Sequence, residues 1–551
     1  MKNIYYFLAI VFFISCKNEV RKIDYFKRYN EDTEILEQQR HENPRMKFKL
    51  IQSNYLDLNR EFRPFMKDLE GFSEEEYNIL KPLILEKDIP SIQESVMKGK
   101  LTYEKLTLFY LYRILKFERD STKYLNAVIS LNPNVLNQAR EKDQNKASGI
   151  SKFSLNGMPI ILKDNIDTKY MNTTAGAVAM KDHLPKKDAF IVERLKNSGA
   201  LILGKANLSE WAYFFCEGCP LGYSALGGQT LNPYGRKEFE TGGSSSGSGV
   251  SVAANYAVAA IGTETAGSIT SPSSMNSVVG LKPTIGLLSR SGIIPISNTL
   301  DTPGPMTKSV IDNAILLEAL IGLDTNDETQ VLANFSNDQY IDFEKKYDFL
   351  KEKRVGVIAD LLQDSIYNKS AQKIAKVGAN IIKLAPEEMN YDGFLTLLAA
   401  DMKRDFPNYF KRLDLNKNDI ITLGNVVNFN NENILKRAPY GQQLFEKIVN
   451  DTTSDIQLVT VRENLIKRGR KYFKALEANE VDVILSINNT HSAIAAVAKF
   501  PTITVPMQYK EHGEPVSLTF IGRPNTEKEM LAFAFAFEQL TKVRKMPKNY
   551  Q

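Results

Sequence analysis

The sequence predicts an α/β protein with a central mixed β-sheet flanked by helices. Short apolar runs alternate with segments of helical periodicity: Met158–Leu162 suits a buried strand, Ala189–Ser198 a helix and Leu201–Leu203 a second strand. Another apolar run, Val481–Ile487, brings the strand pattern back near the C-terminus. With 551 residues, 43% hydrophobic and 25% charged, the chain can bury a large core.

Residues 1–15 have the anatomy of an export signal. Lys2 is followed by the apolar run Ile4–Ile14, which is too short for an ordinary spanning helix, and the small Ser15 precedes Cys16. This arrangement resembles a bacterial lipoprotein processing site. It would make Cys16 the lipidated first residue of a protein anchored in the cell envelope, on the extracytoplasmic (periplasmic) side of a membrane. An uncleaved anchor and an ordinary signal peptide are the alternatives.

Three segments are therefore expected: a signal peptide over 1–15, a tether and helical extension over 16–90, and the main domain over 91–545. The main domain opens with amphipathic helices that are interrupted at Gly99 and begin again at Thr102, which is suited to an N-cap. Residues 324–480 have helical periodicity and many charges.

Charge and cysteine usage exclude several classes of function. The net charge is +5 and the basic residues are scattered, without a stripe that alternates with aromatics, so no nucleic-acid partner is expected. Cys216 and Cys219 form a lone C-x-x-C, which cannot complete a zinc site. A local disulfide and two reduced thiols are equally compatible with them. We expect no metal and no cofactor, and the oligomeric state is not predicted.

The stretch Gly242–Gly267 is the most unusual part of the chain. Fifteen of the 21 residues from Gly242 to Gly262 are Gly, Ser or Ala, and the apolar run Tyr256–Ile261 separates two small-residue loops. We expect the order loop, small-residue helix, buried strand, loop. No lysine lies between Gly242 and Gly280, which argues against a phosphate-binding loop. Lys163 directly follows the predicted buried strand Met158–Leu162. The end of a buried strand is a position from which a side chain can reach an active or binding site, so Lys163 is a candidate site residue.

Gly243–Gly247 matches G-x-S-x-G, the nucleophile elbow of α/β-hydrolases. That elbow must follow a buried strand, but residues 232–241 are polar and turn-like. The four histidines also lack a strong catalytic context: His41, His183, His491 and His512. A serine hydrolase with so few histidines would need another base, and lysine is the documented alternative.

Several separated motifs, in the same order, resemble the amidase signature hydrolases: GMPIILKDNIDTKYMNTTAG (157–176), GGSSSGS (242–248), GTETAGS (262–268) and VVGLKPTIGLLSRSG (278–292). Three more segments resemble bacterial peptide amidases in particular: ILGKANLSEWA (202–212), GGQTLNPYG (227–235) and SRSGIIPIS (289–297). The resemblance implies the amidase signature fold and hydrolysis of carboxylic amides, with C-terminal peptide amides or other small amides as substrates.

The resemblance also implies residue roles. Ser268 would be the nucleophile that forms the acyl-enzyme, Ser244 a bridging serine on a cis peptide bond, and Lys163 the base. The backbone N–H groups of Thr265, Ala266, Gly267 and Ser268 would hold the oxyanion. Ser245 would support the network, or serve only as a structural loop residue.

Three alternatives remain at this point. A subunit that transfers ammonia to another protein, as in tRNA-dependent amidotransferases, shares these motifs, but an export signal argues against it. A non-catalytic surface-binding lipoprotein is disfavoured because Lys163, Ser244 and Ser268 are all intact. A histidine-dependent esterase is the weakest alternative.

Overall fold

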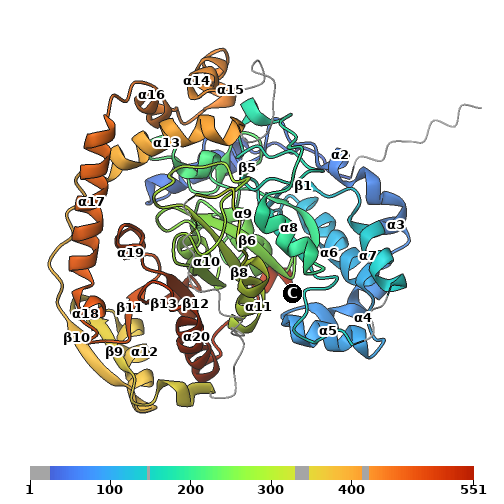
Figure 1. Cartoon of the computed structure of the whole chain (residues 1–551). Coiled ribbons are helices and arrows are strands. Elements are labelled where there is room, and N and C mark those ends of the chain that lie inside the picture. Colours follow the sequence, from blue (N-terminus) through green and yellow to red (C-terminus); the bar gives the residue numbers. More distant parts are fainter. Residues whose placement is uncertain (1–24, 146–148, 329, 331–345, 412–420) are drawn as a thin grey trace, which may run out of the picture.

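The computed structural model describes residues 25–145, 149–328, 330, 346–411 and 421–551, and has a large mixed sheet at its centre (Figure 1). The strands are β1 (Val128–Leu131), β2 (Pro159–Lys163), β3 (Leu201–Ala206), β6 (Ala259–Glu264), β7 (Val279–Lys282), β8 (Thr302–Thr307), β9 (Arg354–Ile358), β10 (Asn380–Leu384), β11 (Val483–Ile487), β12 (Thr502–Tyr509) and β13 (Pro515–Ile521). Their order is β1-β3-β2-β6-β8-β7-β12-β13-β11-β9-β10. β4 (Tyr223–Ser224) and β5 (Gly228–Gln229) form a separate pair.

Helices flank this sheet (Figure 1). They are α1 (Asp32–Gln38), α2 (Leu58–Phe62), α3 (Met66–Glu70), α4 (Glu74–Ile84), α5 (Ile89–Met97), α6 (Tyr103–Glu118), α7 (Val135–Gln144), α8 (Phe190–Asn197), α9 (Ser246–Ala253), α10 (Thr270–Met275), α11 (Val310–Leu320), α12 (Ser365–Lys376), α13 (Phe394–Lys411), α14 (Leu423–Asn431), α15 (Ile434–Arg437), α16 (Gln443–Val449), α17 (Asp455–Tyr472), α18 (Lys474–Glu477), α19 (Ser492–Ala498) and α20 (Glu527–Thr541). Short 3-10 turns include η4 (Glu210–Tyr213). The predicted fold class is confirmed.

The parallel part of the sheet brings two chain segments to one edge. β2 pairs in parallel with β3 on one side and with β6 on the other. Every residue of β2 and β6 is buried, as expected for strands covered on both faces. Because parallel strands point the same way, the C-terminal ends of β2 and β6 lie at the same edge, and polar side chains that follow them can meet.

Small residues let α9 pack closely beside these strands. A Cβ atom at Gly247 would lie 2.4 Å from the carbonyl oxygen of Asn207 and 2.5 Å from that of Ala127. α9 contacts β2, β6 and α10. The predicted order of loop, small-residue helix, buried strand and loop is therefore observed, with β6 beginning at Ala259.

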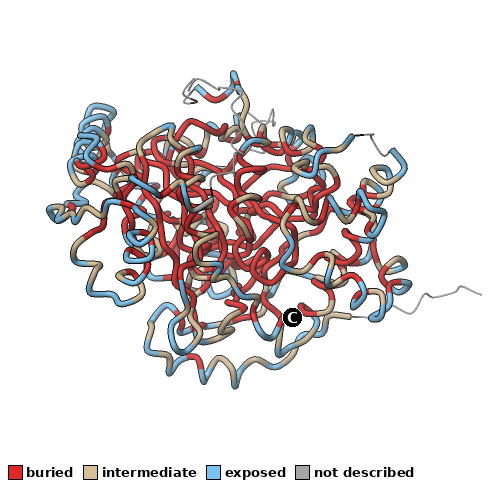
Figure 2. The backbone as a smooth tube through the Cα atoms, turned by 90° about the horizontal axis from the view of Figure 1, so that it is seen from below, coloured by how far each residue is buried: buried red, intermediate tan, exposed pale blue. Residues whose placement is uncertain are grey.

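Buried residues fill the centre of the molecule, and exposed residues lie on its outer helices and loops (Figure 2). Residues of the N-terminal helices, such as Phe62 and Tyr77, belong to the same hydrophobic core as the sheet. Thr102 caps α6 as predicted, because its side chain accepts a hydrogen bond from the N–H of Lys105. Among the described residues, no helix has the length and apolarity needed to cross a bilayer. Residues 1–15 and Cys16 lie outside the described residues.

The segment 324–480 is less uniformly helical than its periodicity predicts. It contributes α12 to α18, but also the parallel strands β9 and β10 at one end of the sheet. β10 is partly exposed and both strands have five residues, so their apolar pattern is weak beside the long amphipathic helices around them.

Candidate active site

Lys163 lies at the end of β2 and its amine reaches the loop that precedes α9. The Nζ atom is 2.7 Å from Ser244 Oγ, 2.9 Å from Thr263 Oγ1 and 3.1 Å from Thr263 O. Lys163 and Ser244 have no exposed surface. The contact between Lys163 and Thr263 follows from the sheet pairing, because Thr263 is on β6, the parallel neighbour of β2.

Burial strongly favours the neutral amine at this position. Loss of hydration lowers the pKa of Lys163 to about 7, while the negative charges of Asp301 and Glu264 act in the opposite direction. The three oxygens around Nζ fit this state. A neutral amine can donate to the two Thr263 oxygens and use its lone pair to accept the Ser244 hydroxyl proton.

The Gly242–Ser246 loop contacts the backbone of Ser209 and of α10. The Gly243–Ser244 peptide bond is cis, as the family resemblance implied. The Ser244 carbonyl accepts a hydrogen bond from the N–H of Ser209 at 3.0 Å. Gly242 has a φ of +63°, and a Cβ there would lie 2.7 Å from the backbone of Ser271 and Pro272. Gly242 therefore packs against the first turn of α10, and a side chain at this position would separate the two segments.

Ser245 connects this loop to β6. Its hydroxyl donates to the Thr263 carbonyl at 3.1 Å and accepts from the Thr263 N–H at 3.2 Å. Its own N–H donates to the carbonyl of Ser268 at 3.1 Å. These hydrogen bonds place Ser245 between β6, which carries Thr263, and the turn that carries Ser268.

Residues 265–268 form the turn between β6 and α10. Glu264 shapes this turn, because its carboxylate accepts hydrogen bonds from the N–H groups of Ile269 and Thr270 at 2.7 and 2.8 Å. Gly267 adopts a φ of +107°, a conformation that L side chains rarely take. Within the described chain, the N–H groups of Ala266, Gly267 and Ser268 have no hydrogen-bond partner. Three donors are thus available beside Ser268.

Ser268 is half-buried, unlike the fully buried Ser244. Its hydroxyl forms no hydrogen bond with the parts of the chain that the structure describes, including Ser244. The structure therefore brings Lys163 and Ser244 into direct contact, and brings Ser268 to the same region through its backbone contact with Ser245.

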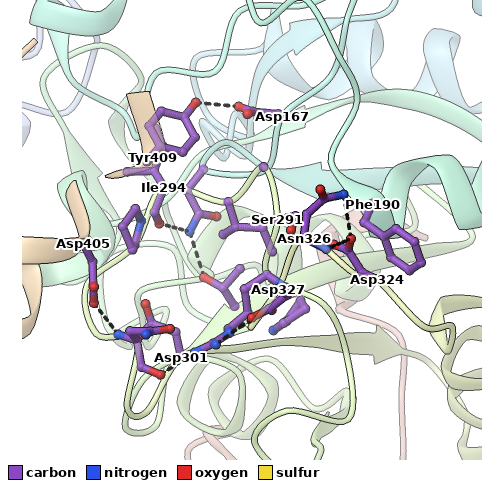
Figure 3. A pocket seen from close by; sticks show the side chains of 18 of the residues that line it. Asp167, Phe190, Ser291, Ile294, Asp301, Asp324, Asn326, Asp327, Asp405 and Tyr409 are labelled. Atoms are coloured by element: carbon purple, nitrogen blue, oxygen red, sulfur yellow. Dashed lines mark hydrogen bonds and ion pairs between the residues drawn. The ribbon is translucent and has the colours of Figure 1, made fainter. Parts of the chain in front are cut away.

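A cavity of about 670 Å³ reaches this region, because Asn165, Thr263 and Thr265 are in its lining. Figure 3 shows other lining side chains, among them Asp301 and Asp405. Residues of the loop 294–301 and of α13 also line the cavity. Asp301 joins this loop to the turn, since it accepts a hydrogen bond from the Thr265 hydroxyl at 2.6 Å and others from the N–H groups of Ile296 and Ser297. The cavity is large enough for a small organic substrate.

Four polar residues of the site were not anticipated: Asn165, Thr263, Glu264 and Asp301. Asn165 donates to Thr263 Oγ1 at 3.0 Å, and so helps to fix the oxygen that faces Lys163. Asn165, Thr263 and Glu264 are close in sequence to Lys163 or Ser268, at the ends of the predicted strands. Their position at strand ends could have identified these three residues as candidate site residues from the sequence. Asp301 is 33 residues beyond Ser268, and no local pattern marks it.

The histidines have other partners. The ring of His491 contacts Ser486 Oγ and Tyr472 Oη, and the ring of His183 contacts Tyr409 Oη. These contacts give no support to a histidine-dependent esterase. Cys216 and Cys219 are paired as a disulfide, the first of the two alternatives. In the described ranges, no group of three or more His, Cys, Asp or Glu side chains could hold a metal ion.

A mixed α/β sheet, a buried amine in contact with a serine hydroxyl, and a turn of available N–H groups are features of enzymes that carry out acyl chemistry. Comparison with known proteins identifies the family. The family model described as Amidase matches residues 106–486. The chain is 36% identical over 483 residues to a probable amidase of Arabidopsis thaliana, covering 84% of this chain and 92% of the relative.

Two solved structures agree. An amidase family protein from Bacillus anthracis superposes with a TM-score of 0.84 at 35% identity, covering 91% of this chain and all of that one. The native peptide amidase of Stenotrophomonas maltophilia gives a TM-score of 0.77 at 35% identity, covering 84% and 98%. The chain therefore belongs to the amidase signature family and is an amide-hydrolysing enzyme, which excludes the non-catalytic binding protein. A glutamyl-tRNA(Gln) amidotransferase subunit from Caldanaerobacter subterraneus is also related, at 29% identity over 83% of this chain and 97% of the relative.

Proposed function

We propose that this enzyme hydrolyses carboxylic amides, C-terminal amides of peptides among them, through an acyl-enzyme on Ser268. The observation that carries the proposal is the 2.7 Å contact between the fully buried Lys163 amine and Ser244 Oγ. The likeness to a peptide amidase supports the substrate class.

In the proposed reaction, Ser268 Oγ attacks the amide carbonyl as its proton passes to Ser244, and the Ser244 proton passes to the neutral Lys163 amine. The N–H groups of residues 265–268 stabilise the oxyanion of the tetrahedral intermediate. Collapse of the intermediate breaks the C–N bond, and the proton returns from Lys163 through Ser244 to the leaving amine. Water then hydrolyses the ester on Ser268 by the same route.

The test begins with intact-protein mass after exposure to a serine-reactive fluorophosphonate. We expect one adduct, mapped to Ser268, together with turnover of peptide amides. Replacement of Lys163, Ser244 or Ser268 by Ala is expected to abolish turnover in folded protein, and the three losses should not add because the residues act as a unit. A fully active Ser268→Ala enzyme would refute the assignment.

An ammonia-transferring subunit remains the alternative, and it makes a different prediction: release of ammonia from amides would then depend on a partner protein. Turnover by the isolated chain at a rate that no added protein increases would exclude it.

We also propose that residues 1–15 are a lipoprotein signal peptide, that Cys16 carries the lipid, and that residues 16–90 form a tether and helical extension before the catalytic domain at 91–545. The pattern of Lys2, Ile4–Ile14 and Ser15 supports this. Metabolic labelling with a radioactive fatty acid tests it: the label should enter the wild-type envelope protein and be absent from Cys16→Ser.

A further inference from the structure

The cavity beside the proposed active site has an unbalanced charge. Its wall contains eight carboxylate side chains and three cationic ones. Of the cations, Arg290 is already committed, because its Nη2 lies 3.0 Å from Asp327 Oδ1 and its Nε 3.2 Å from Asp327 Oδ2. Asp301 lines the cavity beside the turn that carries Ser268, since it accepts a hydrogen bond from Thr265, and Asp405 on α13 lines the same cavity (Figure 3).

Asp405 has an oxygen that is not used by the protein. One carboxylate oxygen, Oδ2, accepts a hydrogen bond from the Asn298 N–H at 2.6 Å, and the other has no partner in the described chain. Burial, with a further contribution from Asp401 and Asp301, raises the pKa of Asp405 to about 7. This is the behaviour of a carboxylate that is partly buried without a cation of its own.

A second acceptor in the wall also lacks a donor. The Asn165 side chain is 2% exposed, and its Nδ2 faces the oxygens of Thr263 and Ile294. Its Oδ1 is buried and has no hydrogen-bond partner among the described residues. A buried acceptor without a donor is costly unless a ligand supplies the donor.

The ligand chemistry that fits is an organic cation. Carboxylates attract positive charge, but those in the described part of the chain are not grouped closely enough to hold a metal ion. An ammonium or guanidinium group instead brings several N–H donors on a larger frame, so it can satisfy separated acceptors.

The geometry also indicates which part of the substrate occupies this cavity. With the carbonyl carbon at Ser268 and its oxygen at the turn 265–268, the leaving ammonia of a primary amide needs little space. The cavity of about 670 Å³ has Thr265 in its lining, next to this turn, and its space is therefore available to the acyl part. We propose, resting on the function proposed above, that this cavity selects amides whose acyl part carries a cationic group, held against Asp405 and Asp301.

The test compares two substrates that have nearly the same shape and differ in charge, N-acetyl-argininamide and N-acetyl-citrullinamide. At pH 8 and low salt, we expect the wild-type kcat/KM to be about tenfold or more higher for the arginine amide, with the ratio falling as salt is added. In Asp405→Asn the ratio should fall towards one. Asp182→Asn removes the same charge from a side chain that is 86% exposed and outside the cavity, and its ratio should remain that of the wild type.

Binding to the Ser268→Ala protein separates this inference from the proposed function. Calorimetry should show tighter binding of N-acetyl-argininamide than of N-acetyl-citrullinamide, and the difference should be lost in Ser268→Ala/Asp405→Asn. Cation-selective binding without turnover of any amide by the wild type would refute the proposed function and support the cation site. Equal kcat/KM values and equal affinities for the two amides would overturn the cation site, whether or not the Asp405 variant folds.

Discussion

Replacing Lys163 by Met tests the buried neutral amine directly. The substitution keeps an unbranched side chain of similar length in the same position and removes the ionisable group. Lys163 has no exposed surface, and its pKa is lowered from 10.5 to about 7 mainly by loss of hydration. One unit of pKa corresponds to about 1.4 kcal/mol, so a change of this size lowers the unfolding free energy of the protein with a protonated Lys163 by about 5 kcal/mol.

The sign of the pH dependence follows from proton binding. Between pH 7 and 10.5 the unfolded chain holds a proton on Lys163 that the folded protein has released, so stability rises with pH in this range. The destabilisation is complete below pH 7 and vanishes above 10.5. From about pH 6.5 to about pH 9 the wild type should gain about 2.5 kcal/mol of unfolding free energy from this one group. Lys163→Met cannot gain it. The hydrogen bonds lost from Nζ, about 1 kcal/mol each, shift the comparison by an amount that does not vary with pH.

The assay is urea unfolding of the wild type and Lys163→Met at about pH 6.5 and about pH 9. At each pH, the difference in unfolding free energy between the two proteins cancels the titration of all other groups. The exposed substitution Lys373→Met is the matched control, and its difference from the wild type should not change between the two pH values. In parallel, the wild-type kcat/KM should rise with pH through about 7 as the amine loses its proton. If the stability difference between the wild type and Lys163→Met is the same at both pH values, Lys163 is not a buried neutral amine and the mechanism fails.

Three further changes probe the surroundings of Lys163. Thr263→Val removes the hydroxyl that faces Lys163 Nζ and Asn165, and should lower kcat at least about tenfold and stability by about 1–3 kcal/mol, whereas Thr263→Ser should retain both properties. Glu264→Gln removes a charge that raises the pKa of Lys163, so the acidic limb of the kcat/KM profile should move to lower pH; an unchanged limb would contradict this. Gly242→Ala places a Cβ against the backbone of residues 271 and 272, and should reduce activity and thermal stability much more than Gly218→Ala, which has a similar φ of +69° but open space around it.

The sequence was informative where local pattern determines structure. The strand predicted at Met158–Leu162, with Lys163 directly after it, is observed as β2 at Pro159–Lys163, because a fully apolar run suits a parallel strand covered on both faces. The close approach of the two small-residue loops follows from the absence of side chains between them. Asp301 could not be found in this way. Its contact with Thr265 depends on how the chain returns to the sheet in β8, which no short window encodes.

Comparison of two buried lysines explains why Lys163, and not its neighbour on the next strand, is suited to act as a base. Lys205 Nζ lies 3.4 Å from a carboxylate oxygen of Asp164, so a formal counter-charge is within direct reach. Every oxygen in contact with Lys163 Nζ belongs to a neutral group, on Ser244 or Thr263. The carboxylates of Asp301 and Glu264 influence Lys163 without bonding to it, since their own hydrogen bonds hold the turn after β6. Burial lowers the pKa of Lys205 as well, but the contacting Asp164 carboxylate favours the protonated form of that amine, which cannot accept a proton. Burial without any nearby negative charge would instead lower the pKa further and leave a weaker base. Burial opposed by two carboxylates that do not contact it holds the pKa near neutrality, where a group can both take a proton from Ser244 and return it.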